Sequence, residues 1–317
     1  MNPPYDITNE ILKLIATISE KIGEVNAKYL IKTNPTLRKH NQIRTIHSSL
    51  KIEGNTISEA QITALLENKR VVGPEKDILE VLNALEVYKK INTLKPEKEK
   101  DFLKAHQLLL NQLIEHPGKY RNKSVGIMKG AKLEHIAPPF DNVPYLMNEL
   151  FHYLTDKSEL TLIKSCVFHY ETAFIHPFLD GNGRMARLWQ TLILMQEYPI
   201  FEHLPFESLI AKNQDAYYAA LSNSDKEGKS TKFIEYMLKM INLSLDEILE
   251  NSTKKLHADD RIQLFLENNK HEFSRKDYKA YFKDISSATA SRDLKKAVEN
   301  KWITKKGDKK TTLYRKK

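Results

Sequence analysis

Apolar residues recur at helical spacing along most of the chain. In the first such stretch, residues 7–30, the apolar positions are Ile11, Leu14, Ile15, Ile18, Ile22 and Val25. This spacing places apolar side chains on one face of a helix. The same pattern predicts further helices over residues 37–52, 58–67, 75–91, 101–114, 143–154 and 159–175. We therefore expect a mainly helical protein.

The helical period fails between Ser124 and Ala137, where apolar residues stand on both sides of Lys129-Gly130. A short apolar run on each side of a glycine-containing turn predicts a β-hairpin. After the hairpin the helical spacing returns, and residue 141 or 142, Asp or Asn, is expected to cap the helix that follows.

The last part of the chain has a different pattern. A polar connection at residues 251–259 marks a candidate domain boundary. Three helical segments and two short strands follow it, at residues 260–269, 274–281, 286–300, 302–306 and 311–316. This order of elements predicts a winged helix-turn-helix.

Charge is distributed unevenly along the 317 residues, whose formal net charge is +9. Residues 254–317 hold 19 Lys and Arg against 9 Asp and Glu, an excess of ten positive charges, so residues 1–253 are close to neutral. A near-neutral body joined to a basic end predicts two units, and the basic unit could meet nucleic acid.

The sequence also indicates a compartment. Cys166 is the single cysteine and lies in an apolar helical stretch, which predicts a small buried side chain rather than a nucleophile. No apolar run approaches the length of a membrane span, and the N-terminal residues lack the regions of a secretory signal. We therefore expect a protein of the reducing cytoplasm.

The candidate functional residues lie at positions 176–187, His-Pro-Phe-Leu-Asp-Gly-Asn-Gly-Arg-Met-Ala-Arg, directly before an apolar helical run. Gly181 and Gly183 stand at a helix start, where free backbone N–H groups and the positive end of the helix dipole favour an anion. Glycine also lets the main chain approach phosphate oxygens. Arg184 and Arg187 are three residues apart, so we expect them on nearly the same side of the first turn, as suits a polyphosphate.

Two further residues complete the predicted site. Asp180 offers a hard oxygen ligand to Mg²⁺ that is bound to substrate phosphates. His176, on the other side of the loop, can take a proton from an attacking hydroxyl. Each fragment alone is an ordinary loop or turn, but seven chemically constrained positions within twelve residues together predict a phosphate site.

Residues 176–187 resemble the signature of the Fic (Fido) family, His-x-Phe-x-(Asp/Glu)-Gly-Asn-Gly-Arg-x-x-Arg, at every defined position. The resemblance extends over about residues 43–238, and in it the segment 118–121, Gly-Lys-Tyr-Arg, looks like the family's approach to its target-binding flap. It implies an all-α Fic-type helical core with a short β-hairpin flap. The implied parts are an N-terminal helical region, the Fic catalytic core and a small C-terminal winged helix-turn-helix domain, at residues 1–95, 96–252 and 253–317.

The intact signature implies transfer of AMP from ATP–Mg²⁺ to a Ser, Thr or Tyr hydroxyl of a target protein. His176 would be the general base for that hydroxyl, and Asp180 would bind Mg²⁺ between the α- and β-phosphates. Asn182 would cradle the phosphates together with the backbone of Gly181 and Gly183. The protein itself supplies positioning and charge stabilisation in such a transfer.

Other roles follow from the same resemblance. Arg184 and Arg187 would hold the outer phosphates and the pyrophosphate leaving group, and Tyr217 and Tyr218 would lie on the nucleotide-base side. The hairpin would pair with an extended segment of the target; without the resemblance an ordinary surface hairpin is preferred. The expected flap residues are Ser124, Val125, Gly126, Ile127 and Met128.

Residues 49–55, Ser-Leu-Lys-Ile-Glu-Gly-Asn, resemble the inhibitory motif of the family, (Ser/Thr)-x-x-x-Glu-(Gly/Asn). Alone, Ser49 and Glu53 are a pair common on solvated helices. Beside the signature they imply that Glu53 pairs with Arg187 and occupies the place of the γ-phosphate. In some relatives this glutamate instead positions water to remove AMP from a modified protein, and the sequence leaves both directions open.

Residues 285–296 look like a recognition helix, with Ser286 or Ser287 as its N-cap and a basic wing at residues 305–317. Such a module binds duplex DNA through the major groove, but a winged helix can equally serve protein interaction or packing. A nucleotide-sensing, DNA-binding regulator is therefore the rival function. The oligomeric state stays open, with a homodimer among the alternatives.

Overall fold

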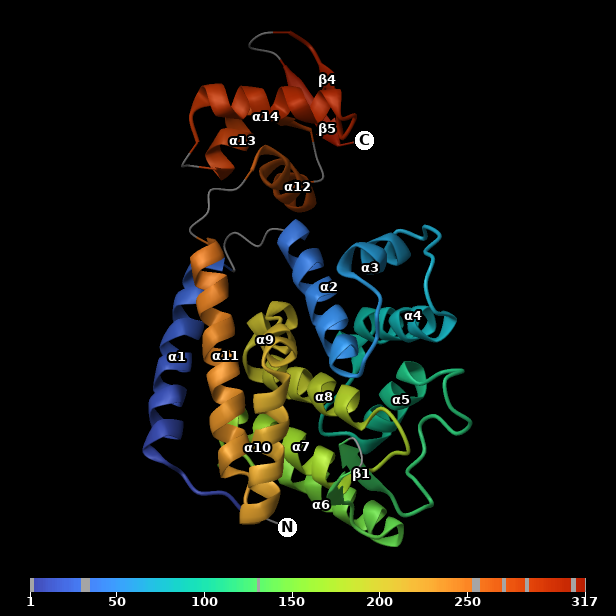
Figure 1. The fold of residues 1–317 in the computed structure, drawn as a ribbon. Helices are drawn as coiled ribbons and strands as arrows, with labels where there is room; N and C mark the ends of the chain where they lie inside the picture. The colour runs from blue at the N-terminus through green and yellow to red at the C-terminus, as the bar shows by residue number, and fades with distance from the viewer. Residues whose placement is uncertain are drawn as a thin grey trace. The chain divides into compact units, whose positions relative to one another are not determined.

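The computed structural model describes residues 3–29, 35–129, 132–252, 257–269, 272–282, 285–308 and 312–316. The chain divides into two compact units (Figure 1). The larger unit comprises residues 1–25 and 41–248, and the smaller comprises residues 26–40 and 249–317. Among the described residues, no helix combines the length and the apolar character that a membrane span requires.

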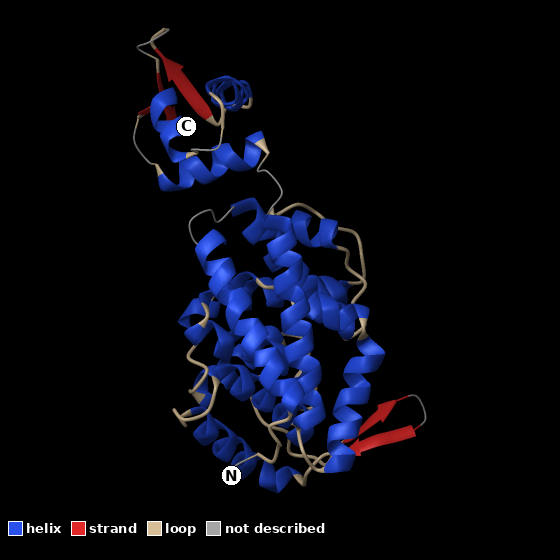
Figure 2. Ribbon diagram, turned by 90° about the vertical axis from the view of Figure 1, so that its left-hand side faces the viewer, coloured by secondary structure: helices blue, strands red, loops and turns tan. Residues whose placement is uncertain are grey.

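The larger unit is built from helices (Figure 2), which confirms the expected all-α class. The elements that lie wholly or mostly in this unit are, in chain order, α1 (Asn9–Tyr29), α2 (Pro35–Ile52), α3 (Glu59–Leu66), α4 (Glu75–Lys89), η1 (Ile91–Thr93), α5 (Glu99–Leu109), β1 (Gly126–Lys129), β2 (Lys132–Ile136), η2 (Phe140–Asn142), α6 (Val143–Leu154), α7 (Thr161–Ile175), α8 (Asn182–Glu197), η3 (Pro199–His203), α9 (Glu207–Lys212), α10 (Gln214–Glu227) and α11 (Thr231–Ser252). Every helix that the apolar spacing predicted before residue 175 is present, with ends shifted by a few residues.

The centre of the larger unit is a cluster of fully buried aromatic rings. Phe102 of α5 lies within 6 Å of several rings, in edge-to-face or stacked contact. Its ring partners are Phe151, Phe168, Phe178 and Trp189. Phe178 belongs to the loop between α7 and α8, so this core fixes one point of the loop that carries the candidate site.

Helix α1 lies alongside α11 (Figure 1), although the two are more than 200 residues apart in the sequence. The Lys21 ammonium contacts Asp246 at 2.6 Å and Asn242 at 2.8 Å. Near the start of α1, the Thr8 hydroxyl donates to Glu235 at 2.8 Å. The first helix is therefore an integral part of the larger unit.

Strands β1 and β2 form the expected hairpin, which projects beside the helices (Figure 2). Their antiparallel register pairs Gly126 with Ile136 and Met128 with Leu133, and it shifts between Ile127 and Met128. Ser124 and Val125, two of the expected flap residues, precede β1. The turn at residues 130–131 lies outside the described residues.

Two local predictions were wrong. The helix expected over residues 101–114 ends at Leu109, and Gln112 adopts a left-handed φ of 60°, which a continuing α-helix excludes. The cap expected at Asp141 or Asn142 is absent, because both residues belong to the 3₁₀ turn η2. Asn142 has helical φ and ψ of −84° and −15°, whereas a capping side chain needs an extended backbone.

The smaller unit contains α12 (Ala258–Asn268), β3 (Phe273–Ser274), α13 (Arg275–Tyr281), α14 (Ser287–Glu299), β4 (Ile303–Lys306) and β5 (Leu313–Lys316). Its strands form an antiparallel sheet in the order β3-β5-β4. Strand β3 was not expected, but the three helices and the last two strands match the predicted order, and Ser286 caps α14 by accepting from the Thr289 N–H at 3.0 Å. The winged helix-turn-helix assignment stays a prediction.

We expect Phe102→Ala to lower the free energy of unfolding by about 3–5 kcal/mol, because it leaves a cavity among the aromatic rings. Urea denaturation measures this loss. Val72→Ala is the control, since Val72 is 85% exposed and its removal leaves no cavity. A loss below about 1 kcal/mol for Phe102→Ala would show that the ring cluster is not the core of this unit.

Candidate active site

The candidate site begins where α7 ends. His176 follows the helix in the left-handed conformation, with φ 52° and ψ 58°, and its N–H donates to the Thr172 carbonyl at 3.0 Å. Gly181 precedes α8 with φ 85°. These two left-handed residues bound a short loop between tightly packed helices, and they place His176 at one end of the loop and the free N–H groups of α8 at the other.

The Asn182 side chain fastens this loop. Its Oδ1 accepts from the Phe178 N–H at 2.9 Å, and its Nδ2 donates to the Phe178 carbonyl at 2.9 Å. Both polar ends of the amide are thus used within the protein. Any contribution of Asn182 to phosphate binding falls to its backbone N–H in the first turn of α8.

The two signature arginines have different carboxylate partners. Arg187 donates to Glu53 at 2.6 Å, to the Ser49 hydroxyl at 3.1 Å and to the Ser49 carbonyl at 2.9 Å. Arg184 donates to Glu80 at 3.2 Å and to Asp180 at 3.0 Å. The contact expected between Glu53 and Arg187 is therefore present, whereas the Glu80 contact was not foreseen.

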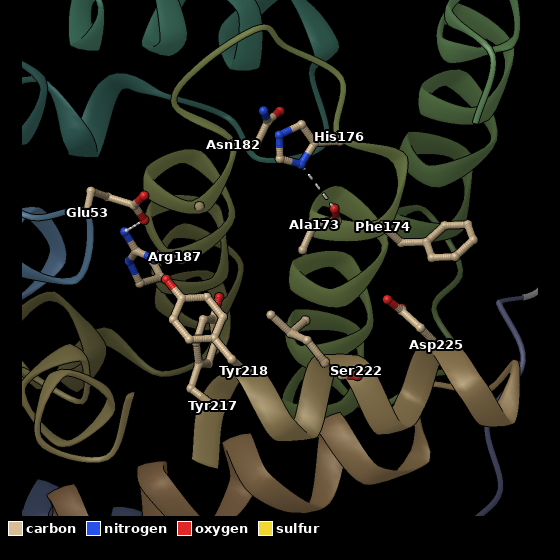
Figure 3. Close-up of a pocket in the computed structure, with 12 residues that line it drawn as sticks. Glu53, Ala173, Phe174, His176, Asn182, Arg187, Tyr217, Tyr218, Ser222 and Asp225 are labelled. Carbon is tan, nitrogen blue, oxygen red and sulfur yellow. Dashed lines mark hydrogen bonds and ion pairs between the residues drawn. The ribbon is translucent and has the colours of Figure 1, made fainter. Parts of the chain in front are cut away.

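A cavity of about 200 Å³ opens beside α8 (Figure 3). Its lining combines the end of α7, the first turn of α8, the Glu53 carboxylate and one side of α10. The lining residues are Glu53, Ala173, Phe174, His176, Asn182, Gly183, Arg187, Tyr217, Tyr218, Leu221, Ser222 and Asp225. Arg184 does not line this cavity, contrary to the expectation that both arginines lie on the same side, because its guanidinium is held by Glu80 of α4.

The two glycines serve different purposes. A Cβ at Gly183 would lie 2.5 Å from Glu53 Oε1 and 3.1 Å from an Arg187 nitrogen, so glycine is needed for the ion pair to approach the helix. A Cβ at Gly181 would lie 2.7 Å from Leu110, and its positive φ also favours glycine. Gly181 therefore allows the loop to pack, and Gly183 leaves open the space where an anion meets α8.

Residues 96–194 match the Fic/DOC family. A Fic family protein from Desulfovibrio desulfuricans G20, known from a crystal structure, is 38% identical, with a TM-score of 0.77. The match covers 100% of this chain and 98% of that protein. This chain belongs to the Fic family.

Curated relatives of this Fic chain carry the name protein adenylyltransferase. That of Nematostella vectensis is 30% identical over 223 residues, which cover 66% of this chain and 49% of the relative. That of Caenorhabditis elegans is 28% identical over 217 residues, covering 64% and 40% respectively. The chain thus spans about half the length of these curated relatives. The solved Fic-1 structure from C. elegans, at 22% identity and a TM-score of 0.61, shares the fold.

His106 supports the loop between α7 and α8, a role that the sequence did not predict. This buried ring stacks on Phe178 with centroids 3.6 Å apart. Its Nδ1 accepts from the Gly118 N–H at 2.8 Å, so Nε2 carries the proton and donates to the Asp180 carbonyl at 3.0 Å. Burial lowers the pKa of His106 to about 4, which keeps the ring neutral. The sequence offered no metal-ligand or catalytic spacing that could have revealed this role.

Arg121 is the second missed support. Its side chain donates to the His176 carbonyl at 2.8 Å, to the Lys123 carbonyl at 2.9 Å and also to the Pro138 carbonyl. Its own N–H donates to the Pro177 carbonyl at 2.9 Å. One buried guanidinium thus ties the turn that carries His176 to the segments on both sides of the hairpin. The motif at residues 118–121 was the available signal, but it was interpreted as an approach to the flap.

On the α10 side, Tyr217 is held from behind. His169 Nε2 lies 2.9 Å from the Tyr217 hydroxyl, and His169 Nδ1 lies 2.6 Å from Gln190 Oε1. Burial lowers the pKa of His169 to about 3, so the ring is neutral. Its Nδ1–H therefore donates a hydrogen bond to Gln190 Oε1, and its Nε2 accepts one from the Tyr217 hydroxyl. Burial also raises the pKa of Tyr217, which remains a neutral phenol. Tyr217 and Tyr218 offer the cavity an aromatic wall.

The donor set fits Mg²⁺ that arrives with a nucleotide. The described residues contain no group of three or more His, Cys, Asp or Glu side chains placed to hold a metal ion. Asp180 is 48% exposed, and its Oδ1 is oriented by Arg184 and by the Gly181 N–H. One oriented carboxylate suits Mg²⁺, which keeps its other positions for phosphates and water.

We expect Arg121→Met to lower the free energy of unfolding by about 3 kcal/mol, because several buried carbonyls lose a charged donor. Chemical denaturation measures this change. Arg70→Met is a matched control, since Arg70 lies exposed in a loop. Equal stability of Arg121→Met and the parent would contradict the role of this guanidinium.

Proposed function

We propose that this Fic protein transfers AMP from ATP–Mg²⁺ to a hydroxyl of a target protein. The observation that carries the proposal is the cavity of Figure 3, where His176 and Arg187 line one space at the N-terminus of α8. A base, an anion-binding helix start and a buried guanidinium are what nucleotidyl transfer requires of a protein. The names of the curated relatives support this direction and do not favour AMP removal or nucleotide sensing.

In this reaction, His176 takes the proton of a Ser, Thr or Tyr hydroxyl of the target. The hydroxyl oxygen then bonds to the α-phosphorus while the bond from that phosphorus to the bridging oxygen breaks, and pyrophosphate leaves. Asp180 would hold Mg²⁺, which neutralises phosphate charge when bound. The N–H groups at the start of α8 receive the phosphates, and β1 and β2 offer an edge for the target backbone.

We further propose that Glu53 inhibits this transfer. Arg187 is 1% exposed and needs a counter-charge, which Glu53, itself 33% exposed, supplies at 2.6 Å. Ser49 holds the same guanidinium from the preceding turn of α2. Burial is the largest single influence on the pKa of Arg187 and lowers it, but the Glu53 carboxylate together with Tyr217 and Tyr218 raises the pKa above its ordinary value. While this pair persists, Arg187 cannot receive the γ-phosphate, and ATP binds in a posture unsuited to in-line attack.

We also propose a cellular compartment and a set of domain boundaries for this protein. We place the protein in the cytoplasm on the grounds of its single buried cysteine, Cys166, whose pKa burial raises to about 12. We retain the division into an N-terminal region, a catalytic core and a winged-helix domain at residues 1–95, 96–252 and 253–317.

Glu53→Gly should raise AMP transfer at least about tenfold, because a competing charge-assisted bond to Arg187 is removed. Incorporation of radiolabelled AMP into the protein itself and into a lysate measures the change. The double variant Glu53→Gly, His176→Ala should fold and label nothing. Labelling by the double variant would remove His176 as the base, and an unchanged rate in Glu53→Gly would remove the inhibitory role of Glu53.

DNA binding by the smaller unit is a second candidate function, favoured by the surface of α14. Its buried side faces the core of the unit through Ala290, Leu294 and Ala297. The opposite side is exposed, with small residues near the start of the helix and cations further along, namely Ser287, Ala288, Arg292 and Lys295. A helix that is small and polar at its start and basic afterwards suits the major groove.

If this surface binds duplex DNA, Arg292→Ala should weaken binding and lower the slope of log affinity against log salt by about one. Fluorescence anisotropy at several salt concentrations measures both. Lys89→Ala, an exposed cation of the larger unit, should change neither. Absence of binding at low salt, or binding without salt dependence, would rule out the DNA function.

A further inference from the structure

Glu80 is a buried carboxylate in the middle of α4, and none of the roles described above uses it. It is 7% exposed. Its Oε1 lies 3.2 Å from an Arg184 nitrogen, and its Oε2 accepts from Asn55 Nδ2 at 2.8 Å. A buried carboxylate is stable when it is paired and hydrogen-bonded in this way.

The Asn55 contact attaches the end of the inhibitory segment to α4. Asn55 follows Glu53 by two residues, and its Nδ2 also donates to the Asp77 carbonyl at 3.0 Å. The next residue, Thr56, donates to the Asp77 carboxylate through its N–H at 2.8 Å and through its hydroxyl at 2.6 Å. Glu80 is therefore held in place by the turn that follows α2.

The Arg184 contact leads from Glu80 to the signature loop. Arg184 is nearly fully buried and lies between two carboxylates, Glu80 on α4 and Asp180 at 3.0 Å. Its Nε is buried and has no hydrogen-bond partner among the described residues. The guanidinium is thus fixed by its two terminal nitrogens, one to each carboxylate.

We propose that Glu80 is a positioning residue that acts through Arg184 on Asp180 and sets the affinity of the site for Mg²⁺ with a bound nucleotide. The proposal rests on the function proposed above. Glu80, Arg184 and Asp180 together carry one net negative charge, so Arg184 orients Asp180 without cancelling its attraction for a cation. Without the Glu80 carboxylate, Arg184 would neutralise Asp180 and the group would carry no net charge.

The test is Mg²⁺ dependence of ADP binding to the full chain, measured by calorimetry for the parent and for Glu80→Gln. ADP is the probe because it lacks the γ-phosphate, so the result does not depend on the inhibitory role of Glu53. Loss of a residue that orients a metal ligand typically weakens metal affinity by about tenfold or more. We expect Glu80→Gln to raise the half-saturating Mg²⁺ concentration by about tenfold and to leave ADP affinity in EDTA unchanged.

Glu86→Gln is the matched control, because Glu86 lies on the same helix and pairs with Lys90 at the surface. It should leave the Mg²⁺ dependence unchanged. An unchanged dependence in folded Glu80→Gln, or an equal loss of ADP affinity with Mg²⁺ and in EDTA, would overturn the proposal. Neither the Mg²⁺ dependence nor the ADP affinity in EDTA requires AMP transfer, so a failure of the proposed activity would be recognised separately.

If Glu80→Gln does not fold, Glu80→Asp decides the question. It keeps the negative charge, but its carboxylate is one methylene too short for the contact with Arg184. We expect a smaller rise in the half-saturating Mg²⁺ concentration than for loss of the charge. A folded Glu80→Asp with parental Mg²⁺ dependence would contradict a role that depends on this contact.

Discussion

The buried guanidinium of Arg187 is the constraint on which the site depends. A charge so completely withdrawn from water must have a counter-charge, and breaking a buried pair costs about 3–5 kcal/mol. In this structure Glu53 provides the counter-charge from the end of α2, and Ser49 adds two oxygens one turn earlier. A γ-phosphate would satisfy the same requirement. The proposed inhibition is therefore a competition between two anions, the Glu53 carboxylate and the γ-phosphate, for one buried cation.

The proposed catalytic geometry also depends on a rigid loop. His176 takes a left-handed conformation, which costs about 1 kcal/mol or more for a residue with a Cβ. Three buried side chains compensate for it: Asn182 closes the loop on Phe178, His106 holds the Asp180 carbonyl, and Arg121 holds the His176 carbonyl. His176, the proposed general base, is thus positioned before any substrate arrives.

Much of this architecture could be predicted from local sequence. Apolar spacing predicted α1 to α7 but not α9, α10 or α11. The signature with the inhibitory motif predicted the contact between Glu53 and Arg187. Interactions between distant segments could not be predicted in the same way. Glu80 meets Arg184 across 104 residues, and no spacing in either helix indicates that contact. The cap prediction at η2 was also wrong, because the sequence favoured Asp141 or Asn142 as the cap, whereas both residues belong to a 3₁₀ turn and Asn142 already has a helical backbone.

We propose that Glu53 occupies the place of the γ-phosphate at Arg187, and a comparison of ATP with ADP is the sharpest test of this competition. Calorimetry of both nucleotides with Mg²⁺ would give the ratio of ATP affinity to ADP affinity in the parent and in Glu53→Gly. We expect this ratio to rise by about tenfold or more when the Glu53 carboxylate is removed, because the γ-phosphate then gains a charge-assisted contact with Arg187. The same ratio in both proteins would contradict it.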